Sequence, residues 1–117
     1  MRYSLIFLIF IFGACTQQKK SDNVVAEIDG KALYTTNCAN CHAIKEKLIG
    51  PPLQGVGERW QSKELLYDFI RNSTDVISRN DYAKKLFEEY KQSPMMPFPT
   101  LKNEEIEAIL KYCDNPN

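Results

Sequence analysis

Hydrophobic residues recur at the spacing of amphipathic helices in four separate stretches of the chain. The apolar positions of the first stretch are Val25, Ile28, Ala32 and Leu33. Asp22 or Asn23 precedes it and is a candidate N-cap. The apolar positions of the second stretch are Leu65, Leu66, Phe69 and Ile70. Ser62 stands just before this stretch and predicts a capped helix start there.

The third and fourth stretches show the same spacing of i, i+3, i+4 and i+7. The third contains Ala83, Leu86, Phe87 and Tyr90. Pro94 follows and is expected to stop that helix. The fourth contains Ile106, Ile109, Leu110 and Cys113. It begins near Asn103, and Glu104 and Glu105 in its first turn suit the positive end of the helix dipole.

The segments between these helices are rich in glycine and proline. They include Gly50-Pro51-Pro52-Leu53 and the prolines at 94, 97 and 99. No run of β-branched residues alternates with polar ones, so strands are not expected. The sequence therefore predicts an all-α fold of about four helices with long irregular loops. Loops of that length in so small a domain usually wrap around something.

The N-terminal segment has a different pattern from the rest. Residues 5–12 form eight consecutive apolar residues, which is too short to span a membrane but typical of the hydrophobic region of a signal peptide. Gly13 and Ala14 follow, and then Cys15. This arrangement resembles the lipobox of bacterial lipoproteins, in which the cysteine becomes the lipidated first residue. Ordinary cleavage near Ala14, with Cys15 left as a plain thiol, is the alternative.

This interpretation divides the chain into three parts. Residues 1–14 are expected to be the signal peptide. Residues 15–23 comprise the lipidated Cys15 and a polar tether, and residues 24–117 form the folded domain. An exported, lipid-anchored chain of this kind belongs on the periplasmic side of a bacterial membrane, which is an oxidising compartment.

Charge and histidine content exclude several classes of protein. The chain has 117 residues, with 15 basic and 15 acidic side chains, which argues against a nucleic-acid partner bound through a basic surface. The chain contains one histidine, His42, which excludes zinc proteases of the HExxH type and bis-histidine haem sites.

The motif that carries chemistry is Cys38-Ala39-Asn40-Cys41-His42. The spacing C-x-x-C-H is the attachment signature of c-type haem. Two thiols add to the two vinyl groups of the porphyrin, and the adjacent imidazole can then bind the iron. The competing interpretations are a thioredoxin-like redox pair, a disulfide within the motif, and a zinc site completed by Cys113.

With a single histidine, the sixth iron ligand must be Met, Lys or Cys, or the position stays open. Met95 and Met96 lie in a proline-rich loop, Ser93 to Pro99, and offer two thioethers. The stiffness of such a loop lowers the entropy that is lost when a weak Met–iron bond holds it in place. Simple packing of these methionines in the core is the alternative.

The chain from Val24 to Tyr112 resembles small class I cytochromes c, whose methionine loop often reads M-P-P-F. Aligned on that loop, Met95 takes the ligand position, and Met96 is the alternative. The resemblance implies that the carbonyl of Pro51 accepts a hydrogen bond from the haem histidine and thereby orients it. It also places Arg59 where a haem propionate can bind.

The resemblance makes further predictions about the first and last helices. It implies that Gly30 permits their close crossing, and that Tyr34 packs there with residues such as Ile109 and Tyr112. The family usually has Ser or Thr at the position of Lys102, so Asn103 or Thr100 is expected to cap the last helix. Cys113 is expected to be a buried thiol, and an intermolecular disulfide or a reactive thiol is the alternative.

These observations predict a membrane-tethered cytochrome c with one covalent haem c, ligated by His42 and Met95. Its expected role is electron transfer between redox proteins such as a dehydrogenase, an oxidase or a reductase. No catalytic triad or acid–base pair accompanies the site, so activity as an enzyme is not expected. The rival interpretations are a haem subunit of a larger respiratory oxidoreductase and a small-ligand sensor with a labile sixth ligand.

Overall fold

The computed structural model describes residues 27–116 of the chain. The segments assigned to the signal peptide and the tether, with Cys15, lie outside these residues. Within them the elements are all helical, and no strand occurs, as the sequence predicts. They are α1 (Gly30–Asn37), the short 3₁₀ helix η1 (Val56–Arg59), α2 (Lys63–Arg71), α3 (Ser73–Arg79), α4 (Asp81–Glu89) and α5 (Asn103–Asp114). None of these helices is long and apolar enough to cross a membrane.

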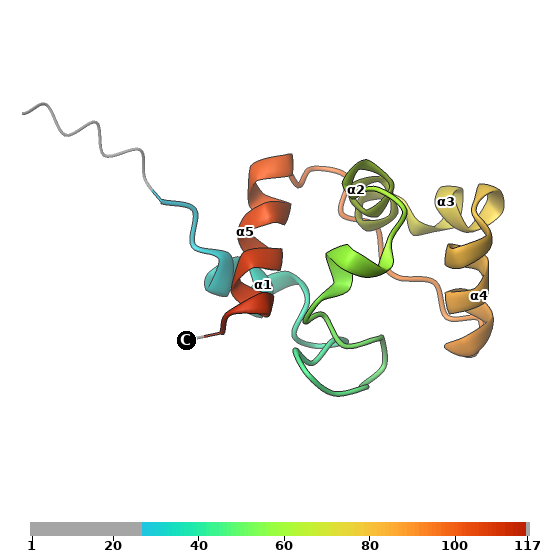
Figure 1. The fold of residues 1–117 in the computed structure, drawn as a ribbon, viewed down its shortest axis with the longest axis horizontal. Helices are drawn as coiled ribbons and strands as arrows, with labels where there is room; N and C mark the ends of the chain where they lie inside the picture. Colours follow the sequence, from blue (N-terminus) through green and yellow to red (C-terminus); the bar gives the residue numbers. More distant parts are fainter. Residues whose placement is uncertain (1–26, 117) are drawn as a thin grey trace, which may run out of the picture.

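The helices form two groups, with irregular loops between them (Figure 1). Helices α1 and α5, from opposite ends of the domain, pack against each other. Helices α2, α3 and α4 follow one another in the chain and form the second group. The loop that joins α1 to η1 runs along one side of the molecule, between the two groups.

Helix α1 begins later than the sequence pattern predicts. The candidate caps Asp22 and Asn23 lie outside the described residues, but a helix that runs from there through Ile28 is wrong, because residues 27–29 are not helical and Ile28 is 41% exposed. The N-cap is Asp29, whose side-chain oxygen accepts a hydrogen bond from the Ala32 amide at 2.9 Å. Gly30 is therefore the first residue of the helix.

Gly30 is the point of closest approach between α1 and α5. A Cβ added there would lie 2.0 Å from the carbonyl oxygen of Ala108 in α5. One turn further along, the rings of Tyr34 and Tyr112 pack with their centroids 5.6 Å apart. These contacts are the close helix crossing that the family resemblance implies.

The second group contains one helix, α3, that the hydrophobic pattern does not mark. Asn72 separates it from α2: its amide donates to the Asp68 carbonyl at 2.8 Å and ends α2. The side chain of Asn72 then accepts from the Asp75 amide at 3.3 Å and starts α3. As predicted, the Ser62 hydroxyl caps α2 by accepting from the Leu65 amide at 3.2 Å.

Helix α5 is capped differently from the prediction. Neither Thr100 nor Asn103 caps it; Lys102 occupies the N-cap position, and its amide donates to the Glu105 carboxylate at 2.8 Å. The Asn103 side chain accepts instead from the Arg71 guanidinium, whose Nε also donates to the Leu101 carbonyl at 3.0 Å. These bonds attach the start of α5 to the end of α2.

The core lies between α2, α3, α4 and the first half of α5. Its fully or nearly fully buried members include Leu66, Val76, Ala83 and Ile106. Cys113 is fully buried in α5, and burial raises the pKa of its thiol to about 12. The thiol is therefore protonated at neutral pH, in agreement with the expected buried cysteine.

Candidate functional site

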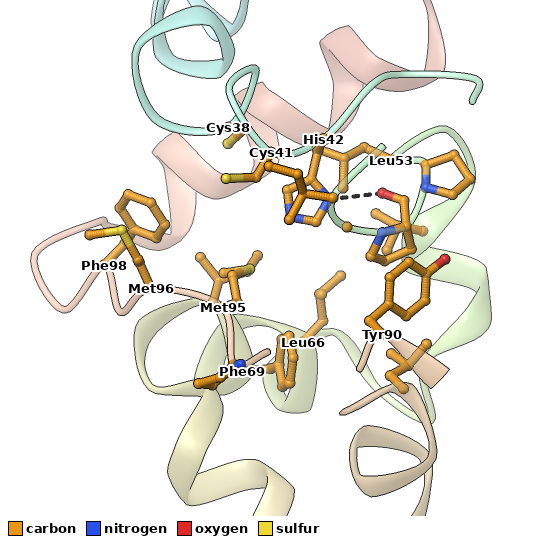
Figure 2. Close-up of a pocket in the computed structure, with 18 of the residues that line it drawn as sticks. Cys38, Cys41, His42, Leu53, Leu66, Phe69, Tyr90, Met95, Met96 and Phe98 are labelled. Carbon is orange, nitrogen blue, oxygen red and sulfur yellow. Dashed lines mark hydrogen bonds between the residues drawn. The ribbon is translucent and has the colours of Figure 1, made fainter. Parts of the chain in front are cut away.

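A cavity of about 620 Å³ lies between the two groups of helices. Its volume is within the range of about 300–1,000 Å³ that is usual for ligand and cofactor sites. The walls are largely hydrophobic, and every helix of the second group contributes to them. Their apolar side chains include Leu53, Val56, Trp60, Leu66, Phe69, Ile77, Leu86 and Phe98. Figure 2 shows several of these side chains facing a shared space.

One wall of the cavity carries the C-x-x-C-H motif. The motif begins where α1 ends, because the Cys38 amide donates to the Tyr34 carbonyl at 2.8 Å and closes the helix. The amides of Cys41 and His42 then both donate to the Cys38 carbonyl, at 3.1 and 2.9 Å. This tight turn places both thiols and the imidazole along the same wall (Figure 2).

The two thiols differ in their surroundings. Cys38 is half-buried, and burial raises the pKa of its thiol to about 11, whereas Cys41 is exposed. The two side chains form no disulfide with each other, and both line the cavity.

The imidazole of His42 is buried and held by backbone groups. Its Nδ1 lies 2.8 Å from the carbonyl oxygen of Pro51, the dashed contact in Figure 2. A carbonyl can only accept, so Nδ1 carries the proton and Nε2 keeps its lone pair for a metal. Gly50 packs against the ring: a Cβ there would lie 2.3 Å from Cε1 of His42.

Arg59 also lies at the wall of the cavity, as its predicted role requires. Its guanidinium donates to the carbonyls of Gln54 and Pro52, at 2.9 and 2.5 Å. Arg59 therefore fixes the loop that directly follows Pro51. Binding of a propionate by Arg59 stays a prediction.

The proline-rich loop of residues 93–99, called the methionine loop below, supplies the wall opposite His42. Figure 2 shows Met95 facing the cavity from that wall, while Met96 lies toward its edge, beside Phe98. Met95 is half-buried, and Met96 is 74% exposed.

Ser73, at the start of α3, supports this wall through Met95 and was not predicted as a site residue from the sequence. It is 1% exposed, and its hydroxyl donates to the Met95 carbonyl at 2.6 Å. No local pattern marks it, because its partner lies 22 residues further along the chain.

The residues around the cavity fit a covalently attached haem. Two thiols and one imidazole lie on one wall, a thioether faces them, and the rest of the lining is largely apolar. Sulfur and imidazole donors are the axial ligands typical of haem iron in electron carriers. A zinc site completed by Cys113 is not formed, since residues 27–116 contain no group of three or more His, Cys, Asp or Glu placed to hold a metal ion.

Comparison with known proteins agrees with this fit. The sequence profile of the family described as Cytochrome c matches residues 28–115, which is most of the chain. The chain belongs to the cytochrome c family. Its cofactor is accordingly a covalently bound haem c with its iron, and its activity is haem-based electron transfer. The predicted cytochrome c fold is confirmed.

Solved structures similar to this cytochrome c come from Rhodothermus marinus. One is a cytochrome c with 32% sequence identity and a TM-score of 0.61. The match covers 73% of this chain and 71% of that one. A second is an engineered form, Rma TDE, with 29% sequence identity and a TM-score of 0.60. The match covers 86% of this chain and 87% of that one. The same engineered protein bound to a carbene intermediate gives a TM-score of 0.58 at 29% identity, with the same coverage. No curated protein matches the chain.

Proposed function

We propose that this cytochrome c is a membrane-tethered electron carrier whose haem iron is ligated by His42 and Met95. When bound, the haem supplies an iron that takes up and releases one electron at a time. The observation that carries the proposal is the placement of the two side chains. His42 and Met95 face the same cavity from opposite walls, as the two axial ligands of one iron must.

The Pro51 carbonyl defines what His42 does in this proposal. By accepting the Nδ1 proton at 2.8 Å, it fixes the tautomer and the orientation of the ring, so that Nε2 is the ligand atom. The same hydrogen bond makes the imidazole a stronger donor to a metal. Because this bond fixes the ring, Nε2 is held in one direction.

Exposure and hydrogen bonding favour Met95 over Met96 as the second ligand. Met95 is half-buried, and its backbone is held by Ser73. Met96 is 74% exposed and lies at the edge of the cavity. A weak thioether–iron bond is better kept by a side chain whose backbone is already fixed, since less entropy is lost on ligation.

The edge of the cavity offers a surface for the proposed redox partners. Ile49 and Met96 line the cavity and are 62% and 74% exposed, and Leu48, which precedes Ile49 in the chain, is 52% exposed. Exposed apolar side chains at the cavity edge suit a small, transient contact with a dehydrogenase, an oxidase or a reductase. The proposal makes the protein a carrier that releases each partner, and not an enzyme with a substrate site.

The proposed tether rests on the N-terminal sequence alone. Cleavage before Cys15 and its lipidation would anchor the domain to the periplasmic side of a bacterial membrane through residues 15–23. The intact mass of protein extracted from membranes tests this. A mass that lacks residues 1–14 and includes acyl chains is expected; a mature protein without acyl chains on Cys15 would reject the anchor.

Optical spectra of two variants test the ligation. The ferric holoprotein should show the charge-transfer band of a methionine–iron bond, Met95→Ala should abolish it, and Met96→Ala should keep it. The converse pattern would make Met96 the ligand. A wild-type ferric protein without the band, which binds carbon monoxide readily when reduced, would favour a small-ligand sensor.

Purification from membranes tests the carrier role separately. A carrier should elute apart from its partners. Co-elution with an oxidase or a dehydrogenase at fixed stoichiometry would instead make the chain a subunit of a larger oxidoreductase.

A further inference from the structure

The methionine loop is attached to one corner of the second helix group, where α2 meets α3. The Ser73 hydroxyl donates to the Met95 carbonyl at 2.6 Å, and the Phe98 amide donates to the Ile70 carbonyl at 3.1 Å. Within residues 27–116, these two bonds are the ones that join residues 94–98 to a helix. Met95 is therefore held at its own carbonyl, and the second bond to the same corner is at Phe98.

The rest of the loop has little hydrogen bonding of its own. Pro94, Pro97 and Pro99 have no amide proton to donate. The residues that lead into the loop from α4, Lys91 and Gln92, have left-handed backbone angles, with φ of 60° and 58°. Non-glycine residues adopt this conformation only when surrounding contacts impose it. Ser73 thus provides the hydrogen bond closest to the ligand side chain.

The burial of Ser73 makes its hydroxyl costly to lose. Ser73 is 1% exposed, so the bond is shielded from water on the serine side, and loss of the hydroxyl leaves the Met95 carbonyl without its bond to a helix. An unpaired carbonyl at this place favours movement of the loop toward solvent, which would carry the Met95 side chain away from the cavity.

We propose that Ser73 is a positioning residue that keeps Met95 in place as the sixth ligand and so determines how readily another ligand replaces it. The inference rests on the proposed function, because it takes Met95 as the iron ligand. It adds a residue that does not itself touch the iron. Its effect is on ligand exchange, because the hydrogen bond favours the ligated position of the loop over the displaced one.

Imidazole binding to the ferric holoprotein measures this effect directly. Imidazole that displaces the thioether abolishes the methionine–iron charge-transfer band. A titration that follows this band therefore gives the dissociation constant of imidazole. In Ser73→Ala the loss of one hydrogen bond should tighten imidazole binding by about fivefold to tenfold. Ser73→Cys, which keeps the size of the side chain but donates more weakly, should shift the constant in the same direction by a smaller factor.

Ser78 provides a matched control in the same helix. Its hydroxyl donates to the Asp75 carbonyl at 2.6 Å, the same bond type and length, but away from the methionine loop. Ser78→Ala should leave imidazole affinity within about twofold of wild type. Equal tightening in the Ser73 and Ser78 variants would overturn the proposal, because it would reflect general loosening of α3.

The two proposals fail in different ways. If Met95→Ala loses the band while Ser73→Ala and Ser73→Cys bind imidazole as the wild type does, Ser73 has no positioning role and Met95 is still the ligand. If Met95→Ala keeps the band, the proposed ligation itself is wrong, and the inference about Ser73 falls with it.

Discussion

At the scale of single residues, the imidazole of His42 is held by its neighbours on the Gly50–Pro51 loop. The carbonyl oxygen of Pro51 lies 2.8 Å from Nδ1 of the ring. Gly50 leaves room for the ring because it has no side chain: a Cβ there would lie 2.3, 2.7 and 2.9 Å from three ring atoms. The Gly50 amide also donates to the Cys41 carbonyl at 2.8 Å, which ties the loop back to the haem motif. The hydrogen bond to Pro51 and the close packing of Gly50 therefore together fix the position of the ring.

Substitution of Gly50 by alanine should displace the ring. Overpacking of this kind typically costs about 1–3 kcal/mol of unfolding free energy, and the same shift should weaken the hydrogen bond to Pro51. Denaturant unfolding of the holoprotein measures the loss. Gly57→Ala is the matched control, because a Cβ at Gly57 meets nothing within 4 Å. A Gly50→Ala protein as stable as Gly57→Ala would contradict the described packing of His42.

The residues of the site differ in how far they could be predicted from the sequence. Cys38, Cys41 and His42 form a local motif whose spacing follows from porphyrin chemistry, so the sequence alone points to them. Pro51 was inferred from a resemblance, and the structure places its carbonyl at His42. Ser73 could not be inferred, since a serine hydroxyl has many potential acceptors and only the folded chain brings Met95 to it.

At the scale of elements, the crossing of α1 and α5 depends on the absence of a side chain at Gly30. A Cβ there would lie 2.0 Å from the Ala108 carbonyl oxygen and 2.5 Å from its carbonyl carbon. These are backbone atoms of a helix, which cannot turn aside as a flexible side chain can. The two helices can accommodate alanine only by moving apart, which also separates Tyr34 from Tyr112.

Gly30→Ala should therefore lower the unfolding free energy by about 1–3 kcal/mol, in spite of the better helix propensity of alanine. Thermal unfolding of the holoprotein measures this loss. Lys31→Ala is the neighbouring control: Lys31 is exposed in the same helix, and its replacement should change stability by less than about 0.5 kcal/mol. Equal stability of the two variants would mean that the crossing tolerates a Cβ.

Helices with a long apolar stripe were predictable, and short ones were not. Helices α2, α4 and α5 lie where the spacing of their apolar residues places them, although α4 ends at Glu89, with Tyr90 as its C-cap, and is not stopped by Pro94. Helix α3 has seven residues, and Val76 and Ile77 are its apolar side chains, so it has no stripe to recognise. It is defined by the caps Asn72 and Asn80. The start of α1 was misplaced because Ile28 fits the helical spacing although it precedes the cap.

At the scale of the whole molecule, polar contacts between α2 and α5 join the two groups of helices. The hydroxyl of Tyr67 in α2 donates to the Glu107 carboxylate in α5 at 2.8 Å. Arg71 adds bonds to Leu101 and Asn103 at the start of α5. Burial, with the Glu107 hydrogen bond second, raises the pKa of Tyr67 to about 12 from its usual value of 10.0.

This shift gives the contact a defined pH dependence. Because the folded state holds the Tyr67 proton more tightly than the unfolded state, the stabilisation is complete below pH 10 and is lost as the pH rises toward 12. Tyr67→Phe should cost about 1 kcal/mol of unfolding free energy at neutral pH. The difference from wild type should shrink between pH 10 and pH 12. A difference that stays constant with pH would contradict the contribution of this hydroxyl.

The presence of a large cavity was predictable, but its walls were not. Long loops in a small all-α domain indicated that the chain encloses something, and the haem motif indicated what it encloses. Which residues face the cavity depends on contacts between distant segments. Arg59 is an example: it lies at the wall, but its guanidinium binds two backbone carbonyls, which no sequence pattern indicates.

The pairing of α1 with α5 has a consequence for the order in which the protein assembles. The two helices lie at opposite ends of the described chain, so their contact closes a loop that contains almost the whole domain. Contacts between such distant segments form slowly, because the entropy of loop closure comes first. During synthesis, α1 has no partner until α5 has been made. Cys38 directly follows α1, so its surroundings are complete only after the two helices have met.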